Sequence, residues 1–337
     1  MKKHVLVAAG AAFALSSHAL AQSAQEQLDT RYDRALAAGY KAMMLCSAIA
    51  NAELTGSQRS PESVHQWELA GIQAPLNDMV QGLPYKIVRT DAGHLRHVRV
   101  TWSDDMLPRI ARHDSGFGCV NLPIGSDPDQ FKLDLEVLPR EPDIIPPATS
   151  TYEYGGIEFH LRRGLDVAGE LEVRPTIPLV LGKAFGELYG EGRTTAVVLR
   201  TLDDEGELSL QLASYAPGFD AHTPQRTWSV AKSIAATLVG AAAQSGEPCV
   251  SAIMPTQLTK GAAEPRRRIT VDHLLRMASG RYSDTPGNRT DPLYWGGTSV
   301  DERAANWPIV HEPGTVYRYA NNDTLMAVQS IECYLEK

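Results

Sequence analysis

The sequence predicts an α+β protein in which antiparallel strands are flanked by helices. Apolar residues recur at helical spacing from 25 to 54 and again from 229 to 244. Between these helices, short strand-like runs at 85–102 and at 195–215 surround turn-forming residues, as expected for two antiparallel pairs. The alternation of helical and hairpin signals therefore indicates an N-terminal and a C-terminal part, each mixed in structure.

The first 21 residues are typical of an export signal, so we predict a signal peptide at 1–21. Two lysines precede an apolar run from 5 to 15, and Ala19-Leu20-Ala21 supplies the small residues of a cleavage site. The apolar run is too short for a bilayer span, which needs about 20 apolar residues. We expect a periplasmic or secreted protein, cleaved near Ala21, with no stable membrane anchor.

Charge limits the classes of partner. The chain has 32 Lys and Arg against 40 Asp and Glu, and loss of two signal-peptide lysines would leave 30 against 40, a formal charge of −10. An acidic protein lacks the basic face that nucleic-acid binding requires, so the expected partner is a small molecule. The length suits about two domains, and the sequence leaves the oligomeric state open.

Residues 22–140 are predicted to form a small α+β region without a catalytic motif. In its first helix one face carries apolar and aromatic side chains: Leu28, Tyr32, Leu36, Tyr40 and Met43 or Met44. Ser60-Pro61-Glu62 is typical of a second helix start, with Ser60 as N-cap. Strands at 85–90 and 95–102 flank the turn Asp91-Ala92-Gly93.

Neither histidines nor cysteines indicate a metal. His94 and His97 are three apart on a predicted strand, so their side chains point to opposite faces. The cysteine spacings match no zinc pattern; the four are Cys46, Cys119, Cys249 and Cys333. Export permits disulfides, and the favoured pair is Cys46–Cys119, whereas four buried thiols are an equal alternative. No metal or organic cofactor is expected.

A Pro-, Thr- and Gly-rich stretch predicts a linker at 141–175, followed by a second domain at 176–337. This domain should open with a helix at 177–188 and a strand pair at 195–201 and 207–215. The next helix has apolar residues at helical spacing and ends at Ser245-Gly246. These apolar positions are Ala231, Ile234, Ala235, Leu238 and Ala242.

Ser229-Val-Ala-Lys232 opens this helix and carries the chemistry. Residues three apart share a helix face, so the lysine amine can lie beside the serine hydroxyl. A serine hydroxyl is a weak nucleophile until a base removes its proton, and lysine is a base only when neutral. The helix N-terminus favours an oxyanion and disfavours an ammonium group. A surface helix with a capping serine and a solvated lysine is the alternative.

Three segments in order resemble the serine β-lactamase-related (penicillin-recognising) family. They are residues 196–240 with Trp228-Ser229-x-x-Lys232-Ser233, residues 269–280, and Pro313-Gly314 through Tyr319-Ala-Asn321. The family includes class C β-lactamases, D-alanyl-D-alanine peptidases, related esterases and 6-aminohexanoate-dimer hydrolases. The resemblance implies a β-lactamase/transpeptidase-like fold, an α/β sandwich with helices flanking an antiparallel sheet.

The resemblance also implies roles for individual residues. Ser229 would be acylated by substrate, Lys232 would take its proton, and Tyr319 would carry a proton to the leaving group. Asn321 would hydrogen-bond the lysine or the substrate carbonyl. Without the family match, Tyr319 would be a buried aromatic and Asn321 a helix cap.

Two aromatic residues in a loop-rich stretch, Tyr282 and Trp295, are candidates to line the cleft. Simple packing is the more common role for such residues.

The sequence departs from the family after Tyr319. The family's third motif, Lys-Thr-Gly or His-x-Gly, does not follow, and Thr259-Lys260-Gly261 is out of order. We therefore expect a chain that is truncated before the last strands of the sheet, without one donor of the oxyanion hole. Losing one such donor costs on the order of 10²–10³ in rate. DNA beyond the codon for Lys337 would test this expectation.

The predicted function is hydrolysis of an amide or ester through an acyl-enzyme. Within the family, Trp228-Ser229 and Tyr-Arg-Tyr-Ala-Asn are most similar to 6-aminohexanoate-dimer hydrolases. β-Lactamase or D-alanyl-D-alanine peptidase activity is the first alternative. A non-catalytic pseudoenzyme or binding module is the alternative from another class.

Overall fold

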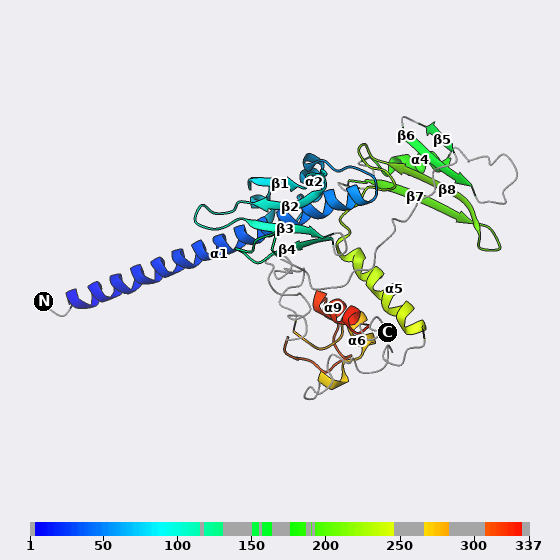
Figure 1. Cartoon of the computed structure of the whole chain (residues 1–337). Helices are drawn as coiled ribbons and strands as arrows, with labels where there is room; N and C mark the ends of the chain where they lie inside the picture. The colour runs from blue at the N-terminus through cyan, green and yellow to red at the C-terminus, as the bar shows by residue number, and fades with distance from the viewer. Residues whose placement is uncertain are drawn as a thin grey trace. The chain divides into compact units, whose positions relative to one another are not determined.

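The structure is a computed structural model (Figure 1). It describes residues 4–114, 118–130, 150–154, 157–163, 176–186, 190, 193–245, 266–282 and 307–331. The chain divides into two compact units. The first comprises Met1–Ala50, Ser60–Leu138 and Gln225–Lys337, and the second comprises Asn51–Arg59 and Pro139–Pro224.

The first unit begins with one long helix, α1 (His4–Leu54), which includes the predicted signal segment. The predicted helix is confirmed, but its predicted buried face begins too early. Leu28 and Tyr32 are exposed, and continuous burial starts at Ala35. From that residue on, α1 packs against a sheet, and Leu36 and Tyr40 are fully buried there. Periodicity reveals the apolar face of a helix but not where its packing partner begins.

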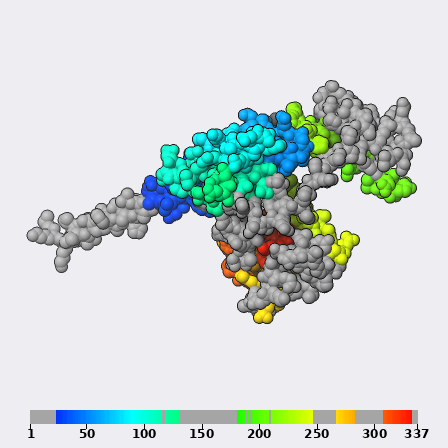
Figure 2. All heavy atoms as spheres, in the orientation of Figure 1, coloured from blue at the N-terminus to red at the C-terminus, as the bar shows by residue number. Residues whose placement is uncertain are grey.

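Two short helices and a four-stranded antiparallel sheet complete the N-terminal part. The helices are α2 (Pro61–Trp67) and α3 (Leu76–Val80). The strands, in spatial order, are β1 (Tyr85–Arg89), β2 (Leu95–Val100), β3 (Arg109–Asp114) and β4 (Gly118–Asn121). Ser60 is the N-cap of α2, and its hydroxyl accepts a bond of 3.1 Å from the Ser63 N–H, as predicted. In Figure 2 the atoms of α2 and this sheet form one continuous surface.

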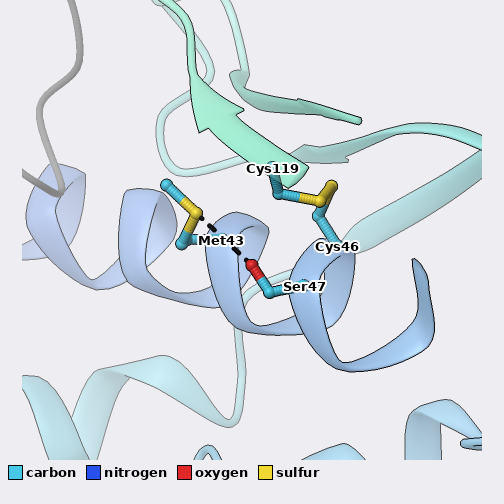
Figure 3. Close-up of a disulfide and its surroundings, with 4 residues drawn as sticks. All are labelled: Met43, Cys46, Ser47 and Cys119. Atoms are coloured by element: carbon cyan, nitrogen blue, oxygen red, sulfur yellow. Dashed lines mark hydrogen bonds between the residues drawn. A yellow bond between two sulfur atoms is a disulfide. The ribbon is translucent and has the colours of Figure 1, made fainter. Parts of the chain in front are cut away.

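A disulfide joins α1 to β4 (Figure 3). It links Cys46, which is fully buried, to Cys119 across a Cα–Cα distance of 6.0 Å. This is the pair favoured from the sequence. The other two cysteines, Cys249 and Cys333, lie outside the described residues.

The second unit contains another antiparallel sheet, with the order β5-β6-β8-β7. Its strands are β5 (Ser150–Tyr154), β6 (Ile157–Arg163), β7 (Ala196–Leu202) and β8 (Leu208–Tyr215). The predicted pair β7–β8 is present. The linker predicted at 141–175 is wrong for β5 and β6, because β6 pairs with β8 and adds both strands to the sheet. α4 (Thr176–Lys183) is shorter than the predicted helix.

The C-terminal part of the first unit is mainly helical. It contains the 3₁₀ turns η2 (Trp228–Val230) and η4 (Arg266–Arg268), and the helices α5 (Ala231–Gln244), α6 (Val271–Leu275) and α9 (Asn321–Gln329). One small core joins the three helices. On α5 the predicted face is partly wrong. Ala235 and Ala242 are buried with Val239, whereas Ile234 and Leu238 are 54% and 52% exposed.

The compact units do not follow the predicted domain boundaries at 140 and 176. Residues 225–337 cluster with the N-terminal part, and residues 139–224 form a unit with the end of α1. Strand pairing explains the second unit, because β6 and β7 share β8. Across the described residues, no helix combines the length and the apolar character needed to span a membrane.

Candidate active site

Ser229 and Lys232 meet at the start of α5. Ser229 is the middle residue of the 3₁₀ turn η2, and Lys232 is the second residue of α5. The Lys232 Nζ donates to the Ser229 Oγ at 3.1 Å. The structure therefore brings the hydroxyl and the amine into direct contact, as one helical turn allows.

Tyr319 and Asn321 reach the same point from a distant segment. The Tyr319 hydroxyl lies 2.5 Å from the Ser229 Oγ, and the Asn321 Oδ1 accepts a bond of 2.5 Å from the Lys232 Nζ. Asn321 is the first residue of α9, whose N-cap is Ala320 without a side-chain cap. The Asn321 side chain bonds the lysine, so it does not take the alternative role of helix cap.

The turn after α6 holds the segment that carries Tyr319. The Gly280 carbonyl accepts from the Val310 and His311 N–H groups at 2.9 and 3.0 Å. Further along, the Arg318 N–H donates to the Met277 carbonyl at 2.9 Å. These backbone bonds fix the approach of residues 310–318 and thereby place the Tyr319 hydroxyl beside Ser229.

Gly280 is required by this close approach. Its φ is +76°, and a Cβ on it would lie 2.1 Å from the His311 carbonyl oxygen. Only glycine can place the two backbones this near to each other without displacement.

A buried ion pair secures the start of α9. The Arg281 Nη2 lies 2.7 Å from the Asp323 Oδ1, and both side chains are at most 3% exposed. The Ser279 hydroxyl donates to the same carboxylate oxygen at 2.7 Å. Because Asp323 is two residues after Asn321, this network orders the turn of α9 that faces Lys232.

The electrostatics of the site lower the pKa of Tyr319. Partial burial alone would raise the pKa of Tyr319. The hydrogen bonds to Ser229 and Lys232 and the Lys232 charge outweigh burial, so this pKa lies below its ordinary value. The Lys232 Nζ is also 5.0 Å from the centroid of the Tyr319 ring. Tyr319 is thus placed to give and take a proton at the serine oxygen.

The residue before Ser229 has an unusual backbone. Trp228 has a φ of +46°, a conformation that bulky side chains rarely adopt. Such a residue costs about 1–3 kcal/mol and persists only when its surroundings hold it, and such strain is common at functional sites.

The other two predicted cleft residues are not brought into this cluster. Tyr282 is 40% exposed, and its ring lies 5.8 Å from the Trp307 ring. The Arg318 guanidinium is 5.6 Å from the Tyr282 ring centroid. Trp295 lies outside the described residues.

Sequence reasoning missed Arg281, Asp323 and Arg226, the last of which contacts Trp228. Arg281 follows a segment that already contains Asp272, His273 and Arg276, so no sequence signal singled it out.

Residues 185–329 match the family model Beta-lactamase. This segment is similar to the β-lactamase family. The match covers less than half of the chain, and the four contacting residues all fall inside it. No curated protein matches the chain.

The match to the β-lactamase family agrees with the mixed helices and antiparallel sheets of the structure and indicates a serine hydrolase in general terms. The N-terminal helices and sheet precede the matched segment.

Proposed function

We propose that this protein hydrolyses an amide or ester through an acyl-enzyme on Ser229. The observation that supports it is the contact of one hydroxyl with two proton-transfer groups, the Lys232 amine and the Tyr319 phenol. A serine with a hydrogen-bonded base, which is itself oriented by a third group, is the arrangement that nucleophilic catalysis needs. Here Asn321 is the orienting group.

The first half of the reaction forms the acyl-enzyme. Neutral Lys232 accepts the Ser229 proton while Oγ attacks the substrate carbonyl carbon, and the carbonyl oxygen becomes the oxyanion. The positive end of the α5 helix dipole lies at this turn and favours the negative charge of that oxyanion. When the tetrahedral intermediate collapses, the bond to the leaving nitrogen or oxygen breaks. Tyr319 protonates the leaving group and is reprotonated from Lys232.

The second half releases the acid. A water molecule loses a proton to neutral Lys232 and attacks the acyl carbon, and Oγ leaves with the proton that Lys232 returns. The residues therefore end in their starting protonation states. Within this class, we propose a substrate like those of 6-aminohexanoate-dimer hydrolases. β-Lactams or D-alanyl-D-alanine peptides are the alternative substrates. We also propose that the protein acts after export.

Covalent labelling tests the proposal. A fluorophosphonate and a fluorescent penicillin are incubated with the folded full chain, and the labelled peptide is identified by mass spectrometry. We expect a label on Ser229 that is absent in Ser229→Ala and unchanged in Ser233→Ala, the exposed serine four residues on. Panels of esters and amides then define the substrate class. Folded protein that takes no label from either probe would favour a non-catalytic binding module.

A further inference from the structure

The backbone strain at Trp228 requires something to hold it. The residue has a positive φ and is half exposed, and it directly precedes the nucleophile. A strained residue relaxes unless several contacts oppose it. The contacts of Trp228 therefore bear on where Ser229 lies.

These contacts come from α1 and from the loop before η2. The indole stacks on the ring of Tyr40 of α1, with centroids 6.2 Å apart and an angle of 18° between the planes. The Arg226 guanidinium lies 4.6 Å from the indole centroid. Tyr40 is fully buried in the N-terminal core, so it is a rigid platform for the stack.

Arg226 binds the same platform by hydrogen bonds. Its Nη1 donates to the Tyr40 hydroxyl at 2.7 Å and to the Glu68 carbonyl, and its Nη2 donates to the Ala70 carbonyl at 3.0 Å. The Tyr40 hydroxyl in turn donates to the Glu68 carbonyl at 2.9 Å. The planar guanidinium of Arg226 thus joins α1 and the turn after α2 to the segment that leads into Ser229.

We infer that Arg226 and Trp228 are positioning residues that fix Ser229 on the N-terminal α+β region, so that this region is part of the catalytic scaffold. The inference rests on the proposed function for its kinetic consequence. The matched family segment includes both residues, but their anchors, Tyr40, Glu68 and Ala70, lie outside it.

Small displacements matter at this position. The Ser229 Oγ has to stay within hydrogen-bond reach of both Lys232 and Tyr319. A misplacement of about 1 Å can cost on the order of 10²-fold in rate. Loss of the anchor should therefore slow acylation while leaving substrate affinity largely unchanged, because neither residue is assigned a substrate contact.

Three variants of the full chain test the inference. Arg226→Gln removes the cation and most of its donors, and Tyr40→Phe removes one acceptor but keeps the stacked ring. Arg99→Gln is the control, since Arg99 is an exposed arginine of β2 in the same unit. The readouts are the fluorophosphonate acylation rate, kcat and KM on an ester, and hydrogen–deuterium exchange of the peptide 225–232.

We expect acylation and kcat to fall about 10- to 100-fold in Arg226→Gln and about 3- to 10-fold in Tyr40→Phe, with KM within threefold. Exchange in 225–232 should rise in both variants, and Arg99→Gln should match the wild type. If Arg226→Gln does not fold, Tyr40→Phe carries the test alone.

Exchange separates this inference from the proposed function. If the wild type takes no label but exchange at 225–232 still rises in both variants, the anchor stands and the hydrolase proposal fails. The anchor would be overturned if exchange at 225–232 in both variants matched the wild type. It would also be overturned if the wild type is labelled and both variants are acylated at the same rate.

Discussion

Tyr319 lies between two groups that stabilise its phenolate, the Ser229 hydroxyl and the Lys232 amine. This environment lowers the pKa of Tyr319 even though partial burial opposes the shift. The proposed proton transfers use the same contacts, so the ionisation of this one residue reports on the integrity of the site.

We predict that Lys232→Ala raises the pKa of Tyr319, because the change removes a hydrogen bond and a positive charge that favour the phenolate. Tyrosinate absorbance near 295 nm is followed against pH. The ionisation that occurs at the lowest pH should be absent in Tyr319→Phe and should move to higher pH in Lys232→Ala. Tyr215→Phe is the control. Burial raises the pKa of Tyr215, so its loss should affect only the alkaline end of the curve. A Lys232→Ala curve that overlays the wild type would contradict the prediction.

Lys41 is a fully buried lysine in the C-terminal half of α1. Its Nζ donates to the carbonyls of Val80, Gln81 and Leu83 at 2.8–3.1 Å. Burial lowers the pKa of Lys41 to about 8, whereas a lysine in the unfolded chain titrates near 10.4. Between these values the unfolded chain binds more protons than the folded protein, so the free energy of unfolding rises with pH.

For Lys41 we predict that the difference in unfolding free energy between the wild type and Lys41→Met increases by about 1 kcal/mol from pH 7 to pH 9. Urea denaturation at several pH values measures it, and the subtraction cancels groups common to both proteins. Below pH 7 the difference should be flat. A difference that stays constant up to pH 9 would show that Lys41 keeps its proton.

Residues were predicted from the sequence where a motif carries the information locally. Ser229 and Lys232 are one helical turn apart, and their contact follows from that spacing. Lys41 and Arg226 were missed because their partners lie 39 or more residues away. A polar residue inside an apolar pattern does not indicate which carbonyls it will bind.

At the scale of elements, the turn after α6 joins the two motif-bearing segments. Gly280 lets the backbone of residues 310–311 lie against this turn. Gly93, in the β1–β2 hairpin, has a similar φ of +87°, but a Cβ added to it would meet no atom within 4 Å. Comparing a substitution at Gly93 with one at Gly280 therefore distinguishes the cost of backbone strain from the cost of steric overlap.

We predict that Gly93→Ala costs about 1 kcal/mol of stability, from the positive φ alone. Gly280→Ala should cost about 3 kcal/mol or more, since the His311 carbonyl must also move. It should also slow Ser229 labelling, because the displaced segment carries Tyr319. Chemical denaturation and labelling measure the two effects. Equal losses in the two variants would mean that the close approach at Gly280 is not formed.

The Arg281–Asp323 pair is predicted to behave as a buried ion pair. Removing one partner leaves an uncompensated buried charge, so Asp323→Asn should destabilise by about 3–5 kcal/mol. Arg281→Met combined with Asp323→Asn removes both charges and should be more stable than Asp323→Asn alone. A double-mutant cycle by urea denaturation measures the coupling. Simple additivity of the two changes would contradict a buried pair.

Elements with local signals were predicted well. The hairpins β1–β2 and β7–β8 follow from turn residues between strand-like runs, and the N-cap at Ser60 follows from its own chemistry. β5 and β6 were missed because their Pro- and Gly-rich surroundings indicate a linker, whereas their pairing depends on β8, which lies more than 40 residues further along. Pairing between strands that are distant in the sequence cannot be predicted from a short segment alone.

At the scale of the whole molecule, the alternating helix and strand signals of the sequence predict the α+β class. They do not predict which segments form each compact unit. The chain leaves the first unit at the end of α1 and again after residue 138, returning at residue 225. Composition marks breaks in a chain but not which pieces come together afterwards. The expectation that the chain is truncated before a third motif stays a prediction.

The disulfide is predicted to stabilise the N-terminal part of the first unit. Cys46 and Cys119 close a loop with a sequence separation of 73 residues, for which loop-closure entropy gives about 4 kcal/mol of stabilisation. Reduction of the wild type should therefore lower the unfolding free energy of the N-terminal part by about that amount. Denaturant melts with and without reductant measure it, with Cys46→Ala/Cys119→Ala as the control that reductant should leave unchanged.

Reduction should also test how far the nucleophile depends on this region. If Tyr40 holds the Ser229 loop through Arg226 and Trp228, labelling of Ser229 should be lost at the denaturant concentration at which the N-terminal core melts. Both midpoints should shift together when the disulfide is reduced, because one cooperative unit contains the anchor and the serine. Labelling that survives the melting of α1 would show that residues 225–337 hold Ser229 in place without the N-terminal region.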